Sequence, residues 1–157
     1  MDSVVRQGGD EIRITVPCKT EYVRTVRRAI AEFATLRNMP RPDVEEVEVA
    51  ASEAVANVVR HAYPEAKRAP RVRVRCYHRK DGLTVEVADK GRGFDAPPDT
   101  FVPELDFDRE GGMGITLMKQ LMDRVTFVSK PDVGTKIKMT KRVREAVSEC
   151  ALALPKY

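Results

Sequence analysis

A glutamate and an asparagine lie four residues apart in a stretch of small apolar residues, ASEAVANVVRHAYP (51–64). Glu53 is the only ionisable residue between Val49 and Val59, although 33% of the chain is charged. In a helix, Glu53 and Asn57 lie on one side. That side could be a solvated polar face. Its small apolar neighbours favour a buried pair, which needs partners because an unpaired buried polar group costs about 1–3 kcal/mol.

Two glycine segments could bind a ligand beside this pair. In ADKGRGFD (88–95), Asp89 offers a hydrogen-bond acceptor, and Gly91 and Gly93 let the backbone approach something closely. GGMGITL (111–117) stands where a helix begins, and the exposed N–H groups and helix dipole there suit phosphate. Each segment alone also describes an ordinary turn. No P-loop motif with its lysine is present.

The N-terminal half of the chain predicts one strand and two helices. EIRITVP (11–17) alternates as a strand does. Apolar residues at helical spacing predict a helix from a cap at Thr20 to about Asn38. Two prolines break that helix, and Asp43 is predicted to cap the second helix with Glu46 completing a capping box. The second helix runs to about residue 62.

The C-terminal half predicts two hairpins around one helix. PRVRVRCYH and LTVEVAD are joined by KDG (80–82), and RVTFVSK and GTKIKMTK are joined by PDVG. ITLMKQLM predicts a short helix after the glycines, and residues 142–154 are predicted to be helical. This mixed order favours an α+β two-layer sandwich over a doubly wound parallel sheet.

Composition and charge bound the class of protein. The chain has 157 residues, 42% of them hydrophobic, which predicts one domain with a real core. It has no apolar run of about 18 residues and no secretory h-region, so neither a membrane span nor export is expected. The three cysteines, Cys18, Cys76 and Cys150, fit neither a disulfide framework nor a C-x-x-C metal site. The simplest interpretation is a reduced, cytoplasmic protein.

The net charge is +4, and the positive charge is unevenly placed. Arg71, Arg73 and Arg75 alternate with apolar residues, which predicts an antiparallel strand with a solvated basic face. The alternative, more specific interpretation is that this basic face binds an acidic partner. Nucleic-acid binding by this strand remains a minor hypothesis, for which steep salt dependence would be the sign.

Together, and in this order, these motifs resemble the ATP-binding fold of gyrase, Hsp90, histidine kinases and MutL, the GHKL superfamily. The chain looks most like the anti-sigma-factor serine kinases of the RsbW and SpoIIAB group, over about residues 10–142. The resemblance implies a mainly antiparallel mixed sheet with helices on one face and a single domain over 1–157. It also implies an ATP lid at about 96–111 and a tail at 143–157.

The resemblance implies a role for each motif residue. Glu53 is the expected general base, and Asn57 the expected ligand of the Mg²⁺ that bridges the ATP phosphates. Asp89 is expected to accept a hydrogen bond from the adenine amino group, with Thr135 nearby. The expected nucleotide-binding backbone is at Gly91, Gly93, Gly112, Met113 and Gly114.

Two positions are less clear. His61 fits either the nucleotide site or an ordinary surface position at the helix end. SpoIIAB-like members carry an arginine where this chain has Glu110, and the neighbouring Arg109 is a candidate contact to phosphate or to a partner.

The implied function is an anti-sigma factor that is also an ATP-dependent serine/threonine kinase. Its expected partners are a sigma factor, a STAS-domain anti-anti-sigma protein and a second copy of the chain, with no direct nucleic-acid or membrane binding. Two alternatives stay open: a switch kinase of the RsbT kind that activates a phosphatase, and a nucleotide-gated module without catalysis.

Overall fold

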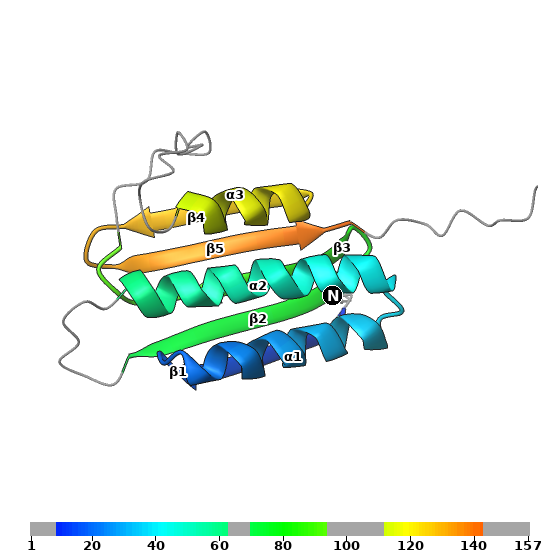
Figure 1. Cartoon of the computed structure of the whole chain (residues 1–157), viewed down its shortest axis with the longest axis horizontal. Helices are drawn as coiled ribbons and strands as arrows, with labels where there is room; N and C mark the ends of the chain where they lie inside the picture. Colours follow the sequence, from blue (N-terminus) through cyan, green and yellow to red (C-terminus); the bar gives the residue numbers. More distant parts are fainter. Residues whose placement is uncertain (1–8, 63–69, 94–111, 143–157) are drawn as a thin grey trace, which may run out of the picture.

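A single antiparallel sheet forms the base of the molecule. The computed structural model describes residues 9–62, 70–93 and 112–142 (Figure 1). Within them, strands pair in the order β1-β2-β3-β5-β4, and each neighbouring pair is antiparallel. The strands are β1 (Glu11–Pro17), β2 (Arg71–Arg79), β3 (Gly82–Ala88), β4 (Arg124–Lys130) and β5 (Gly134–Lys141).

Among the described residues, three helices cover one face of this sheet, with α2 between α1 and α3 (Figure 1). They are α1 (Glu21–Leu36), α2 (Arg41–His61) and α3 (Gly112–Leu121). The apolar side chains of both layers meet in one core, in which Ile30, Val47, Val85 and Met118 are fully buried. The predicted α+β two-layer sandwich is therefore confirmed.

The alternating stretches form strands where the sequence predicted them. Both hairpins are present, and Gly82, which begins β3, has a φ of 129° that favours glycine. The helix after the glycines begins earlier than ITLMKQLM, because its first turn includes Gly112 and Gly114. The predicted tail helix lies outside the described residues, as does the lid at 96–111.

The predicted capping box at Asp43 and Glu46 is wrong. Helix α2 begins at Arg41 with Pro40 as its N-cap, and it accommodates Pro42 in its first turn, where the missing N–H of a proline has no helical partner in any case. Asp43 therefore lies inside the helix and is buried. Glu46 instead accepts a hydrogen bond from Lys141 Nζ on β5. The first helix also ends at Leu36, two residues before the predicted end.

The arginine strand is antiparallel, as predicted, and its arginines lie on the sheet face away from the helices. Arg71 and Arg73 are exposed. Arg75 Nε donates to Glu11 Oε2 (2.8 Å), which holds the pKa of Glu11 down at about 2. This matches the solvated basic face.

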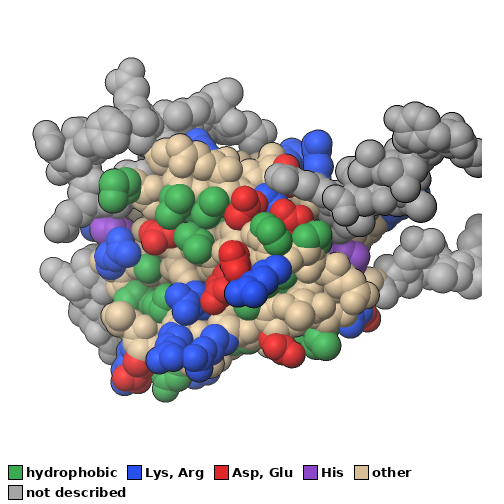
Figure 2. All heavy atoms as spheres, turned by 45° about the vertical axis from the view of Figure 1, so that its right-hand side comes forward, with side chains coloured by type: hydrophobic (Ala, Val, Ile, Leu, Met, Phe, Trp, Pro, Cys, Tyr) green, Lys and Arg blue, Asp and Glu red, His purple; other side chains and the backbone are tan. Residues whose placement is uncertain are grey.

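The helix-covered side carries both signs of charge. In Figure 2, Lys, Arg, Asp and Glu side chains are interspersed with hydrophobic ones over this side. Arg27 of α1 and Glu48 of α2 form an ion pair across the two helices (2.9 Å). No helix among the described residues is long and apolar enough to cross a membrane.

Candidate functional site

The two polar residues of α2 lie against the first turn of α3. A Cβ placed on Gly114 would be 2.7 Å from Glu53 Oε2 and 3.6 Å from Asn57 Oδ1. Only a glycine allows this approach without moving the carboxylate. The structure thus brings Glu53, Asn57 and Gly114 together at the positive end of the α3 dipole, where negative charge is stabilised.

Asn57 has a buried oxygen without a partner. Its Oδ1 is inaccessible to solvent and accepts no hydrogen bond from the described residues. An unsatisfied buried acceptor is costly, so such an atom points to a missing ligand. An amide oxygen is a hard ligand suited to Mg²⁺, which typically takes one or two protein ligands together with phosphates and waters. The described residues contain no cluster of three or more His, Cys, Asp or Glu that could hold a metal alone.

Asp89 lies just after β3 and is held by backbone N–H groups. Gly91 N–H donates to its Oδ1 (2.8 Å), and Thr135 N–H donates to the same oxygen (3.3 Å). The second oxygen accepts no hydrogen bond from the described residues. Burial raises the pKa of the Asp89 carboxyl, although the two N–H donors lower it in part. The free oxygen can accept a hydrogen bond from a ligand amino group.

The glycines next to Asp89 pack against protein backbone. A Cβ on Gly91 would be 2.1 Å from the carbonyl oxygen of Ala62, and one on Gly93 would be 2.0 Å from that of Lys130. Gly93 also has a φ of 58°, which favours glycine. These glycines therefore let the loop fit between the end of α2 and the β4–β5 turn. Only Gly93 of the two lines the cavity described next.

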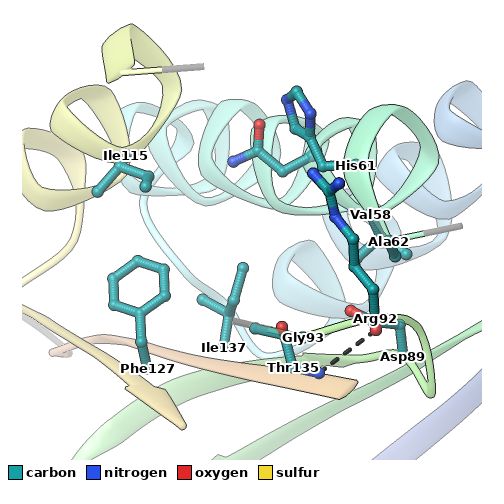
Figure 3. A pocket seen from close by; sticks show the side chains of 11 residues that line it. Val58, His61, Ala62, Asp89, Arg92, Gly93, Ile115, Phe127, Thr135 and Ile137 are labelled. Carbon is teal, nitrogen blue, oxygen red and sulfur yellow. Dashed lines mark hydrogen bonds between the residues drawn. The ribbon is translucent and has the colours of Figure 1, made fainter. Parts of the chain in front are cut away.

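A cavity of about 540 Å³ joins these parts, a size that suits a small-molecule ligand (Figure 3). Its polar side chains come from α2, the loop after β3 and β5, namely Asn57, His61, Asp89, Arg92 and Thr135. Its apolar wall comes from α3, β4 and β5, with Ile115, Phe127 and Ile137. One side can thus pack against an aromatic ring while the other binds polar groups.

The predicted residues differ in where the structure places them. Asn57, His61, Asp89, Gly93 and Thr135 line this cavity, while Glu53 does not line it but lies beside it against Gly114. Gly112 is the first residue of α3, and Met113 is 78% exposed. Arg109 lies outside the described residues.

The sequence did not single out the apolar wall or Arg92. Phe127 and Ile137 are direct neighbours across β4 and β5, and strand alternation places both toward the helices. Strand alternation could thus have predicted that both side chains face the helices. It could not have predicted that the helices leave this face partly uncovered. Arg92 is the variable residue inside D-x-G-x-G, so the motif gave no reason to select it.

Comparisons with known proteins agree with this geometry. The model of the histidine kinase-like ATPase domain family matches residues 16–141. A serine-protein kinase RsbW of Staphylococcus aureus is 33% identical over 143 residues, covering 87% of this chain and 89% of the relative. The RsbW of the bovine RF122 / ET3-1 strain is 32% identical over the same shares.

Solved structures share the fold. The RsbU and RsbW domains of a Mycobacterium tuberculosis protein match with a TM-score of 0.66 at 22% identity, over 87% of this chain and 34% of theirs. The histidine kinase domain of a blue-light-activated kinase from Erythrobacter litoralis matches with a TM-score of 0.54 at 19% identity, over 88% of this chain and 65% of that one.

Proposed function

The chain belongs to the histidine kinase-like ATPase family, among the serine-protein kinases of the RsbW type, and from this premise we propose that it is an anti-sigma factor that phosphorylates its own antagonist. It sequesters a sigma factor, and it transfers the γ-phosphoryl group of ATP to a serine or threonine of a STAS-domain anti-anti-sigma protein. It works in the cytoplasm as a homodimer, without binding nucleic acid or membrane.

One observation carries the catalytic part of this proposal. Glu53 and the unpartnered Oδ1 of Asn57 lie together against Gly114, at the edge of a cavity that Asp89 and Thr135 also line. A carboxylate and a hard oxygen ligand at one helix N-terminus suit transfer of a phosphoryl group, which depends mostly on positioning and on neutralising charge.

Each residue then has a proposed role. Glu53 receives the proton of the attacking hydroxyl, and Asn57 Oδ1 is a ligand of Mg²⁺, which neutralises phosphate charge when bound. Asp89 accepts a hydrogen bond from the adenine amino group, and Thr135 lies beside the base. Backbone N–H groups at Gly112, Met113 and Gly114 bind phosphate oxygens. His61 lines the cavity and has no more definite role, and Arg109 remains a candidate contact to phosphate or partner.

The test of the kinase activity uses labelled ATP, Mg²⁺ and a purified STAS-domain protein. We expect label on a serine or threonine of that protein with the wild type, and a strong loss with Glu53→Gln. The Gln side chain keeps the shape but cannot take the proton. ATP binding without transfer in the wild type would favour the non-catalytic module.

The test of the anti-sigma role is a pull-down with purified sigma factors. Retention of a sigma factor, and its release when unphosphorylated STAS protein is added, supports the role. A chain that retains no sigma factor but activates a phosphatase is instead a switch kinase.

A further inference from the structure

Arg92 is held by its backbone on both sides. Its N–H donates to the carbonyl of Ala62 at the end of α2 (2.8 Å), and its own carbonyl accepts from the N–H of Asp132 in the β4–β5 turn (2.8 Å). Its neighbours Gly91 and Gly93 fit tightly against backbone. The Cα of Arg92 is therefore fixed between two elements, and the side chain alone is free to move.

The guanidinium group of Arg92 lies at the cavity and forms no ion pair with a carboxylate of the described residues. Figure 3 shows the side chain rising from beside Asp89 toward His61, and Arg92 lines the cavity. Unlike Arg27, Arg41 and Arg75, it forms no ion pair within residues 9–62, 70–93 and 112–142. An arginine whose backbone is anchored, and whose guanidinium forms no ion pair among the described residues, is suited to an anionic ligand, because its planar fork can bind two oxygens of one phosphate.

The position of the Arg92 guanidinium along the cavity indicates which phosphate of a nucleotide it can reach. The free oxygen of Asp89 is the proposed acceptor for the base amino group, and Asn57 Oδ1 is the proposed metal ligand near the terminal phosphates. The guanidinium extends from the first toward the helix that carries the second (Figure 3). A nucleotide spanning these two ends places its ribose and first phosphate between them.

We propose that Arg92 binds the α-phosphate of the nucleotide and so determines that the cavity takes nucleotides in preference to nucleosides. This inference rests on the proposed ATP-binding function and adds a residue to it. Arg92 is exposed, so its guanidinium can meet a phosphate without first leaving a buried position.

The test compares affinities for ATP, ADP, AMP and adenosine, measured by NMR titration with Mg²⁺ for the wild type, Arg92→Ala and Arg92→Lys. Because one charge-assisted contact is lost, Arg92→Ala should weaken ATP, ADP and AMP by a similar factor of about tenfold. Adenosine affinity should not change, and Arg92→Lys should recover part of the loss. Arg24→Ala, on α1, is the matched control and should leave all four affinities unchanged.

Each other outcome overturns the inference in a distinguishable way. Equal weakening of adenosine would place Arg92 at the base or in loop structure, and weakening of ATP alone would place it at the γ-phosphate. Unchanged affinities would remove it from the site. A wild type that binds none of the four ligands would contradict the proposed function itself. Thermal unfolding without ligand checks that Arg92→Ala keeps its fold.

Discussion

At the scale of single residues, Asn57 carries a buried oxygen that the described protein does not satisfy. We predict that Asn57→Ala removes most of the Mg²⁺-dependent part of the rise in melting temperature caused by ATP. A ligand that binds only the folded state raises that temperature more the more tightly it binds, so the loss can be followed by thermal shift with and without Mg²⁺. An unchanged shift would exclude Asn57 from the metal site.

At Asp89, the stability of the fold and the binding of ATP are expected to make opposite demands. Burial raises the pKa of its carboxyl in the folded state, so the stability it contributes is present below its unfolded pKa and is lost as the pH rises through the folded pKa. At neutral pH the buried charge is therefore a cost, which Asp89→Asn removes.

We expect ligand-free Asp89→Asn to be at least as stable as the wild type at pH 7, with its relative stability falling toward pH 4. It should lose the thermal shift caused by ATP, because its amide NH₂ replaces the free acceptor. Urea unfolding across pH measures the first effect, with the exposed Asp132→Asn as the control for removing one charge. An Asp89→Asn variant that is less stable than the wild type at pH 7 would contradict this prediction.

Gly114 is a glycine whose missing side chain leaves room for Glu53, the proposed general base. Because the atom that a new Cβ would meet is the mobile end of Glu53, Gly114→Ala should displace the carboxylate while keeping the fold. We expect kcat for phosphoryl transfer to fall about tenfold or more, roughly 1.4 kcal/mol of lost transition-state stabilisation. The melting temperature should be equal or higher, since alanine favours a helix over glycine by about 1 kcal/mol. Full activity would show that the displacement does not matter.

At the scale of elements, one lysine of β5 contacts both α2 and α3. This contact lies near the start of α2, far from His61 at its other end. Lys141 of β5 is 3% exposed, and its Nζ donates to Glu46 of α2 and to the carbonyl of Leu121 at the end of α3 (2.8 Å). Asp43 Oδ1 is 4.0 Å away. The Glu46 side chain is 34% exposed, so removing Lys141 leaves chiefly the charge of the buried Asp43 without compensation, and an uncompensated buried charge typically costs about 3–5 kcal/mol.

We therefore predict that Lys141→Met lowers the free energy of unfolding by about 3–5 kcal/mol. Denaturant unfolding gives the value, and Lys138→Met on the open face of the same strand is the control, which should change it little. A similar small loss in both variants would mean that the buried cluster contributes no more than an exposed lysine.

The same elements explain what the sequence could and could not reveal. Strand alternation and turn glycines predicted the five strands that the described residues form, because these patterns follow from local geometry. Asp43 was misplaced because its partner, Lys141, is far away in sequence and no local rule weighs that contact against a cap. Arg92 and the wall of Phe127 and Ile137 were missed because a cavity depends on how helices sit on a sheet, which periodicity does not encode.

At the scale of the whole molecule, Cys76 is a reporter of global unfolding. It is fully buried on β2, and burial raises the pKa of its thiol to about 12, so the reactive thiolate is scarce in the folded state. We predict that iodoacetamide at pH 8 modifies Cys76 only as fast as the protein unfolds. ATP with Mg²⁺ should slow the reaction, which peptide mass spectrometry can follow residue by residue. A modification rate that is the same with and without ATP would instead indicate local opening of β2.

The strand order has a consequence for how the protein is made. β5 inserts between β3 and β4, and of the strands in the described residues it is the last to leave the ribosome. Asp89 at the end of β3 receives its Thr135 contact only from that strand. A nascent chain stalled before Gly134 therefore holds half of the proposed nucleotide site beside an open strand edge, and a chaperone that shields such an edge would act in that interval.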